Sequence, residues 1–88
     1  MDHKIMWHAI ELIAKSNGLT CSGLAKISGL DPTTFNKSKQ FTSDGAPRWP
    51  SCYTVSKVIR ATGMTIHEFA NYIQCSMNAY KNTNQNDA

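Results

Sequence analysis

The chain has 88 residues, of which 41% are hydrophobic and 17% charged, and its formal net charge is +3. This length permits one domain with one small core and excludes large enzyme folds such as the closed α/β barrel, which needs about 200 residues or more. No apolar run approaches the roughly 20 residues of a membrane span. Three scattered cysteines and the lack of an apolar signal-peptide core before Lys15 predict reduced thiols and a cytoplasmic location, with no membrane partner.

The positive charge is concentrated in the middle of the chain. Residues 15–60 hold seven Lys or Arg residues and two Asp residues, whereas the segments on either side each carry a net charge of −1. Such asymmetry is typical of a surface that faces a polyanion. An ordinary solvated surface is the alternative, and charge alone does not decide between the two.

Periodicity and helix-end signals predict an all-α chain of five short helices. Apolar residues recur every three or four positions over residues 3–17, and Asn17-Gly18 is a helix stop. Thr20 can cap a second helix, which Gly29 ends because glycine readily adopts a positive φ.

A third helix is predicted over residues 32–39. Asp31 can cap it, Pro32 fits its first position, and Phe35 is its one clear core residue. The glycine and two prolines in residues 41–50 indicate a loop.

Two further helices follow the loop. Ser51 can cap the fourth helix and Gly63 ends it, while Thr65 and Glu68 have the spacing of a capping box for the fifth. After about residue 77 the sequence is too polar to pack. The predicted organisation is a domain over residues 1–76 and a disordered tail over residues 77–88.

The second and third predicted helices have the spacing of a helix-turn-helix unit, in which a tight turn with glycine joins two short helices. Ala25 is small enough for two helices to cross beside it, and Gly29 makes the turn. Leu30 fills the space between the helices and Phe35 anchors the second one. This Ala-x-x-x-Gly-Leu-x-x-x-x-Phe arrangement resembles the helix-turn-helix of Cro/CI-type (XRE-type) bacterial and phage repressors, which implies a compact, lambda-repressor-like fold of five helices.

The stretch from about Gly23 to Phe69 resembles more closely the N-terminal DNA-binding domains of LexA-like phage-type repressors. Those carry runs similar to residues 29–39 (GLDPTTFNKSK) and to the Pro-Arg-Trp-Pro segment at 47–50. The chain departs from the family at Ser38, where an apolar residue is frequent, and it leaves no room for the self-cleaving Ser/Lys peptidase domain of LexA-like members. An excised DNA-binding domain and a naturally short regulator both stay open.

The resemblance implies a recognition helix that starts near Pro32 and enters the major groove of double-stranded DNA. Asn pairs with adenine through its amide, Lys donates to guanine or phosphate, and Thr bonds to a base or packs on a thymine methyl group. The residues expected to face DNA on this helix and next to it are Thr33, Thr34, Asn36, Lys37, Lys39 and Gln40. The candidates for phosphate contacts, which position the protein without reading sequence, are Lys26, Arg48 and Lys57.

The implied function is sequence-specific transcriptional regulation, as a repressor that occludes a promoter. Repressors of this type read two half-sites about 34 Å apart, so the resemblance also implies a homodimer, formed in solution or only on DNA. Trp49, between two prolines, is expected to pack as a lid over the core. Stacking of its ring on a sugar or base is the alternative.

Patterns for catalysis or metal binding are weak. The three histidines lack the spacing of metal ligands, no glycine-rich phosphate loop is present, and Cys21 has no ordered base partner. We therefore expect neither an enzyme nor a metal or other cofactor. The rival to the DNA-binding hypothesis is a helical protein-interaction module that keeps the fold without binding DNA.

Overall fold

The computed structural model describes the backbone of residues 2–87 and the side chains of residues 2–81. It contains the α-helices α1 (His3–Ser16), α2 (Cys21–Ile27), α3 (Cys52–Thr62) and α4 (Ile66–Asp87), with one 3-10 turn, η1 (Lys37–Lys39). Within that range no strand forms, although Phe41 and Pro47 make an isolated antiparallel bridge. The prediction of an all-α chain is confirmed for these residues, but the number of α-helices is four and not five.

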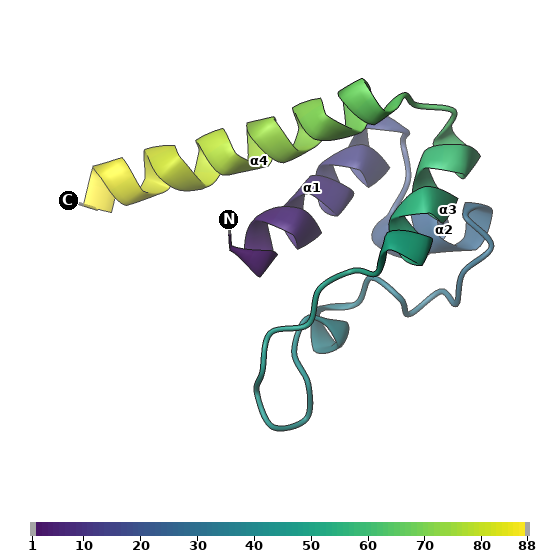
Figure 1. The fold of residues 1–88 in the computed structure, drawn as a ribbon, viewed down its shortest axis with the longest axis horizontal. Helices are drawn as coiled ribbons and strands as arrows, with labels where there is room; N and C mark the ends of the chain where they lie inside the picture. Colours follow the sequence, from purple (N-terminus) through teal and green to yellow (C-terminus); the bar gives the residue numbers. More distant parts are fainter. Residues whose placement is uncertain (1, 88) are drawn as a thin grey trace.

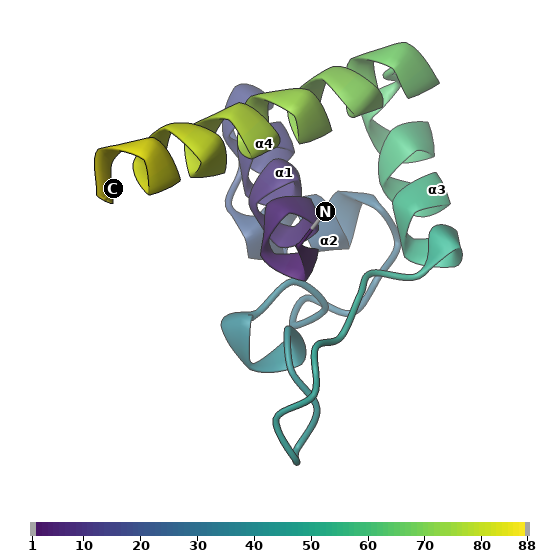
Figure 2. The same cartoon turned by 60° about the vertical axis from the view of Figure 1, so that its left-hand side comes forward.

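The helices form a compact group from which one long connection projects. α1 packs mainly against α4 and also against α2, and α2 contacts α3 (Figure 1). The connection between α2 and α3, which includes η1, extends away from the helices (Figure 2). No helix within residues 2–87 has the length and apolar character needed to cross a bilayer.

The helix ends follow the predicted capping signals. Thr20 and Ser51 each accept a backbone N–H bond of 3.0 Å from the third residue after them. Thr65 and Glu68 form the predicted capping box, with reciprocal side chain–backbone bonds of 3.0 and 3.1 Å. These bonds satisfy N–H groups that the first turn of a helix leaves without partners, so the starts of α2, α3 and α4 are encoded locally.

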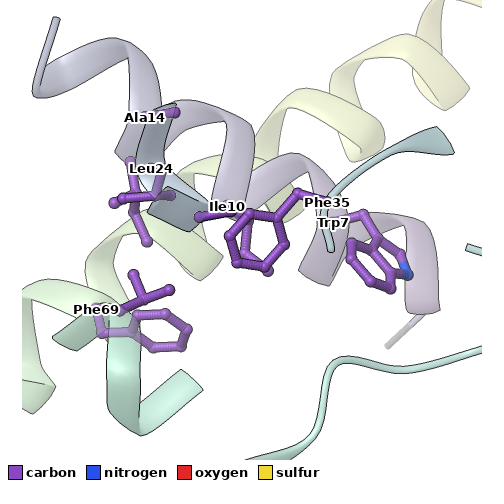
Figure 3. Close-up of a cluster of buried hydrophobic side chains, with 9 residues drawn as sticks. Trp7, Ile10, Ala14, Leu24, Phe35 and Phe69 are labelled. Carbon is purple, nitrogen blue, oxygen red and sulfur yellow. The ribbon is translucent and has the colours of Figure 1, made fainter. Parts of the chain in front are cut away.

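One apolar cluster joins all four helices and the segment after α2. Figure 3 shows Phe35 beside Trp7 and Ile10, with Leu24 and Phe69 toward the other end of the cluster. Trp7, which the sequence assigns to a core or an interface, is only 5% exposed and belongs to the core. The other buried members are Ile13, Ala14, Ala25 and Val58.

The last helix is longer than predicted. We expected it to end near residue 77, but α4 continues to Asp87. Ser76 is completely buried against α1, and the Tyr80 ring meets the His8 ring edge-on at 5.6 Å, so packing on α1 supports α4 beyond the predicted end. The division into a domain over residues 1–76 and a tail over residues 77–88 stays a prediction.

Candidate functional site

The turn after α2 has the predicted geometry. Ala25 is completely buried, and Gly29 has a φ of +73°, a conformation that side-chain-bearing residues rarely adopt. The Leu30 N–H donates to the Ala25 carbonyl at 2.9 Å, which closes the turn. The predictions of a turn at Gly29 and of a core position for Phe35, which is 5% exposed, are therefore confirmed.

The segment that follows is not the predicted helix over residues 32–39. It consists of successive turns and ends in η1. The N–H groups of Thr34, Asn36 and Lys39 each donate to the carbonyl three residues earlier, at 3.0, 3.0 and 2.9 Å. Asn36 interrupts these turns with an extended backbone, at a φ of −65° and a ψ of 150°. The predicted recognition helix is thus replaced by a chain of tight turns.

Local polar groups explain this departure. The Asp31 carboxylate accepts the Thr33 N–H at 2.8 Å, and the Thr34 hydroxyl donates to the Asp31 carbonyl at 2.6 Å. Short polar side chains that bond to nearby backbone in this way compete with helical hydrogen bonding. Phe35 alone faces the core from this segment, so no apolar stripe offsets that competition.

Two core aromatics fix the position of the segment. Phe35 is 5% exposed and its ring lies 6.4 Å from that of Trp7, at an edge-on angle. The Trp7 indole N–H donates to the Arg48 carbonyl at 2.8 Å, and the Arg48 N–H donates to the Gln40 carbonyl at 2.9 Å. Residues near Phe35 and near Arg48 are consequently held against the same end of α1.

Four of the predicted DNA-contacting residues meet at one open hollow, which we call the Trp49 hollow. Its volume is about 480 Å³. The predicted residues that line it are Thr33, Thr34, Lys39 and Arg48, and the others are Trp7, Asp31, Trp49, Pro50, Ser51 and Thr54. Trp49 is a member that the motif did not identify as a contact residue.

Two other predicted residues face a different, smaller hollow of about 200 Å³. Lys37 and Gln40 line it together with Lys4, Trp7, His8, Glu11 and Tyr80. Sequence reasoning missed Lys4, although its spacing of three and four residues from Trp7 and His8 places it on their face of α1. The predicted contact residues are therefore divided between two hollows that share Trp7.

Three predicted residues line neither hollow. Asn36 is exposed and its side chain makes no capping hydrogen bond. Lys26 is exposed in the last turn of α2. Lys57 is half-buried, with its ammonium group 5.3 Å from the centre of the Tyr53 ring, a cation–π contact that keeps the charge.

The cations of this region are available to an anionic ligand. Among residues 2–81 the only ion pair joins His3 to Asp2, so Lys37, Lys39 and Arg48 are not paired with carboxylates there. The Trp49 hollow also contains Asp31, whose pKa is lowered first by the Thr33 hydroxyl, then by the Thr33 N–H and, to a smaller degree, by the charge of Lys39. That carboxylate is ionised at neutral pH and bound to its own turn.

A third hollow, of about 320 Å³, lies where Cys21 meets α1. Burial, and then the charge of Glu11, raise the pKa of the Cys21 thiol. A thiol acts as a nucleophile in its deprotonated form, so this environment disfavours a reactive cysteine. Within the described residues, no three His, Cys, Asp or Glu side chains are grouped as metal ligands.

No protein-family model, curated protein or solved structure matches the chain.

Proposed function

We propose that the chain is a sequence-specific transcriptional regulator that binds double-stranded DNA and acts as a repressor. The observation that carries this proposal is a group of three cations, Lys37, Lys39 and Arg48, that have no ion-pair partner among residues 2–81. They lie on a connection that projects from the helices and is anchored by core aromatics. Phosphate neutralisation by Lys and Arg supplies much of the affinity of DNA-binding proteins. Of the helix-turn-helix pattern in the sequence, the turn at Gly29 and the buried Phe35 are present, whereas tight turns take the place of the second helix.

In this proposal the projecting segment enters the major groove as tight turns. Thr33 and Asn36 are exposed there, and their hydroxyl and amide groups suit the donors and acceptors on base edges. Lys26 and Lys57, on the flanking helices, would contact phosphates and set the orientation. Two copies on half-sites about one helical turn apart would cover a promoter.

The test is fluorescence anisotropy on a labelled duplex between about 50 and 200 mM salt. Wild type should bind with an affinity that falls steeply with salt, at a log–log slope near −0.9 for each neutralised phosphate. The triple variant Lys37→Ala, Lys39→Ala, Arg48→Ala should lower the slope by about 2 to 3 and weaken binding.

A charge-matched control separates a specific surface from net charge. Lys15, Arg60 and Lys81 are exposed and line neither the Trp49 hollow nor the smaller one beside it. Their triple change to Ala removes the same charge and should leave binding near that of wild type. Equal reductions in affinity in the two triple variants, or an inert wild type at about 50 mM salt, would contradict the proposal.

The second candidate function is a helical protein-interaction module. The observation that favours it is the absence of an α-helix over residues 32–39, together with solvent-exposed apolar side chains at Ile27 and Tyr53. A protein-binding module should show no steep salt dependence on duplex DNA. Its contacts, mapped by cross-linking, should fall on these apolar side chains and not on residues 33–39.

A further inference from the structure

Trp49 is the least expected member of the hollow that bears its name. We expected it to cover the core, but 48% of its surface is exposed. Its ring has a tilted contact with the His3 ring, with centroids 6.2 Å apart. The indole therefore lines an open hollow with about half of its surface free to contact a ligand.

The walls of this hollow are held in place before any ligand arrives. The Trp7 indole N–H bonds to the Arg48 carbonyl at 2.8 Å, and the Arg48 N–H bonds to the Gln40 carbonyl at 2.9 Å. The bridge between Phe41 and Pro47 continues this pairing along the connection. These contacts connect the Arg48 side of the hollow to α1, and the contact of Phe35 with Trp7 holds the segment with Thr33 and Thr34 on the same helix, so a ligand would meet a preformed surface.

The hollow is lined by cations, by hydroxyl groups and by an aromatic ring. The side chains of Lys39 and Arg48 have no ion-pair partner among residues 2–81 and supply N–H donors. The Thr33 and Thr34 hydroxyls already donate to Asp31, at 2.6 Å in each case, and so face a ligand as acceptors. The exposed indole of Trp49 is a flat aromatic surface in the same hollow.

We propose that the Trp49 hollow binds one nucleotide unit, with its phosphate on Lys39 and Arg48 and its base stacked on the Trp49 ring. Every base has a π-face, and stacking on aromatic side chains is a general mode of binding for unpaired nucleotides. The volume of about 480 Å³ lies within the range of small-ligand sites. This goes beyond duplex binding, because a paired base inside a duplex has no free face to stack.

The nucleotide unit has two possible sources, a free nucleoside monophosphate or an unpaired nucleotide in a strand. The first experiment follows the tryptophan fluorescence of the full chain with AMP, adenosine and ribose 5-phosphate at constant ionic strength. The other tryptophan, Trp7, is only 5% exposed, and the Trp49→Phe variant measures its emission alone as the background. AMP should change the Trp49 emission saturably. Adenosine and ribose 5-phosphate each lack one of the two contacts, so each should bind at least about ten-fold more weakly than AMP.

Variants separate this site from general attraction to phosphate. The double variant Lys39→Ala, Arg48→Ala should bind AMP about ten-fold more weakly, whereas Lys15→Ala, Lys81→Ala, with the same reduction in charge, should bind like wild type. Bound AMP should also protect wild-type Trp49 from quenching by acrylamide. No saturable change with AMP or a single strand, or equal responses in the two double variants, would overturn the proposal.

A second arm identifies the source. The same titration is made with a short oligo-dA strand, a blunt duplex, and that duplex with a single-stranded dA overhang. Tighter binding of the strand and the overhang than of AMP would indicate an unpaired nucleotide of a polymer, and AMP binding without that gain would indicate a free nucleotide. Steep salt-dependent binding of the blunt duplex without any Trp49 response to nucleotides would overturn this inference alone and leave the proposed function intact.

Discussion

The His8 ring donates a hydrogen bond from Nδ1 to the buried Ser76 hydroxyl at 2.8 Å, and this bond connects α1 to α4. The direction follows from the network, because the Ser76 hydroxyl uses its one proton to donate to the Ile5 carbonyl, also at 2.8 Å. Ser76 is completely buried, so both bonds are shielded from water. The bond between His8 and Ser76 thus fixes α4 against α1.

Ser76→Ala should destabilise the fold by about 1–2 kcal/mol, because it removes both bonds and leaves the His8 N–H without its acceptor. The measurement is urea unfolding followed by circular dichroism. Ser56→Ala is the matched control, since the Ser56 hydroxyl bonds to the Tyr53 carbonyl of its own helix on an exposed face. That control should stay within about 0.5 kcal/mol of wild type, and equal destabilisation of the two variants would contradict the role of Ser76.

Phe35→Ala should cost about 3–5 kcal/mol, because Phe35 is 5% exposed and is the buried core residue of the turns after α2. The same change at Phe41, which is 39% exposed, should cost only about 1 kcal/mol. Thermal unfolding of both variants tests the difference. A Phe35→Ala variant as stable as Phe41→Ala would mean that the connection is not anchored through this ring.

Local signals in the sequence predict the starts of α2 and α3 and the turn that follows α2. The caps at Thr20 and Ser51 and the positive φ at Gly29 depend on residues within three positions of each feature, so they can be identified without the fold. Local signals do not distinguish turns from a helix over residues 32–39, because Asp31 and Pro32 also suit the start of a helix. There, side-chain bonds to the backbone and the single core residue decide in favour of turns.

Features that depend on distant partners could not be predicted. The indole of Trp7 meets the carbonyl of Arg48, 41 residues away, and this bond brings Lys39 and Arg48 to the same hollow. The continuation of α4 past residue 77 is supported by the contact of the Tyr80 ring with the ring of His8 in α1. Periodicity identifies buried faces but not which of them pair, so the division of the contact residues between two hollows requires the structure.

Asp31→Asn should make the stability of the chain less sensitive to acid. The folded-state pKa of Asp31 lies below its ordinary value of 3.8, mainly because the Thr33 hydroxyl and N–H bond to the carboxylate. A lowered folded pKa gives stability that is fully present above the unfolded value and decreases as pH falls through the folded value. Wild type should therefore lose more stability than Asp31→Asn between about pH 5 and pH 2.

Urea midpoints measured across that range test the prediction. Glu11→Gln is the control, because it also removes one carboxylate but lies on α1, outside the turn that Asp31 and Thr33 form. Parallel curves for wild type and Asp31→Asn would show that the Asp31 turn contributes no pH-dependent stability.

Gly29→Ala should destabilise the chain through the backbone alone. An added Cβ would meet nothing within 4 Å, so the cost comes from the φ of +73° and should be about 1–2 kcal/mol. Gly29→Asn should cost less, because Asn tolerates this conformation better than Ala. Thermal unfolding of the two variants provides the measurement, and a Gly29→Ala variant as stable as wild type would contradict the assigned turn.

Asn36→Ala should reduce sequence discrimination more than it reduces general DNA binding. Asn36 is exposed at the start of η1, and its side-chain amide makes no capping hydrogen bond there. Both the donor and the acceptor of that amide are therefore available to an adenine edge. On a preferred duplex selected from random sequences, the variant should bind about 1–3 kcal/mol more weakly, with little change on a scrambled duplex. Lys57→Ala is the comparison, because removing a charge that we propose to contact phosphate should weaken binding to both duplexes alike. If Asn36→Ala keeps the wild-type ratio of affinities for the two duplexes, Asn36 does not read bases.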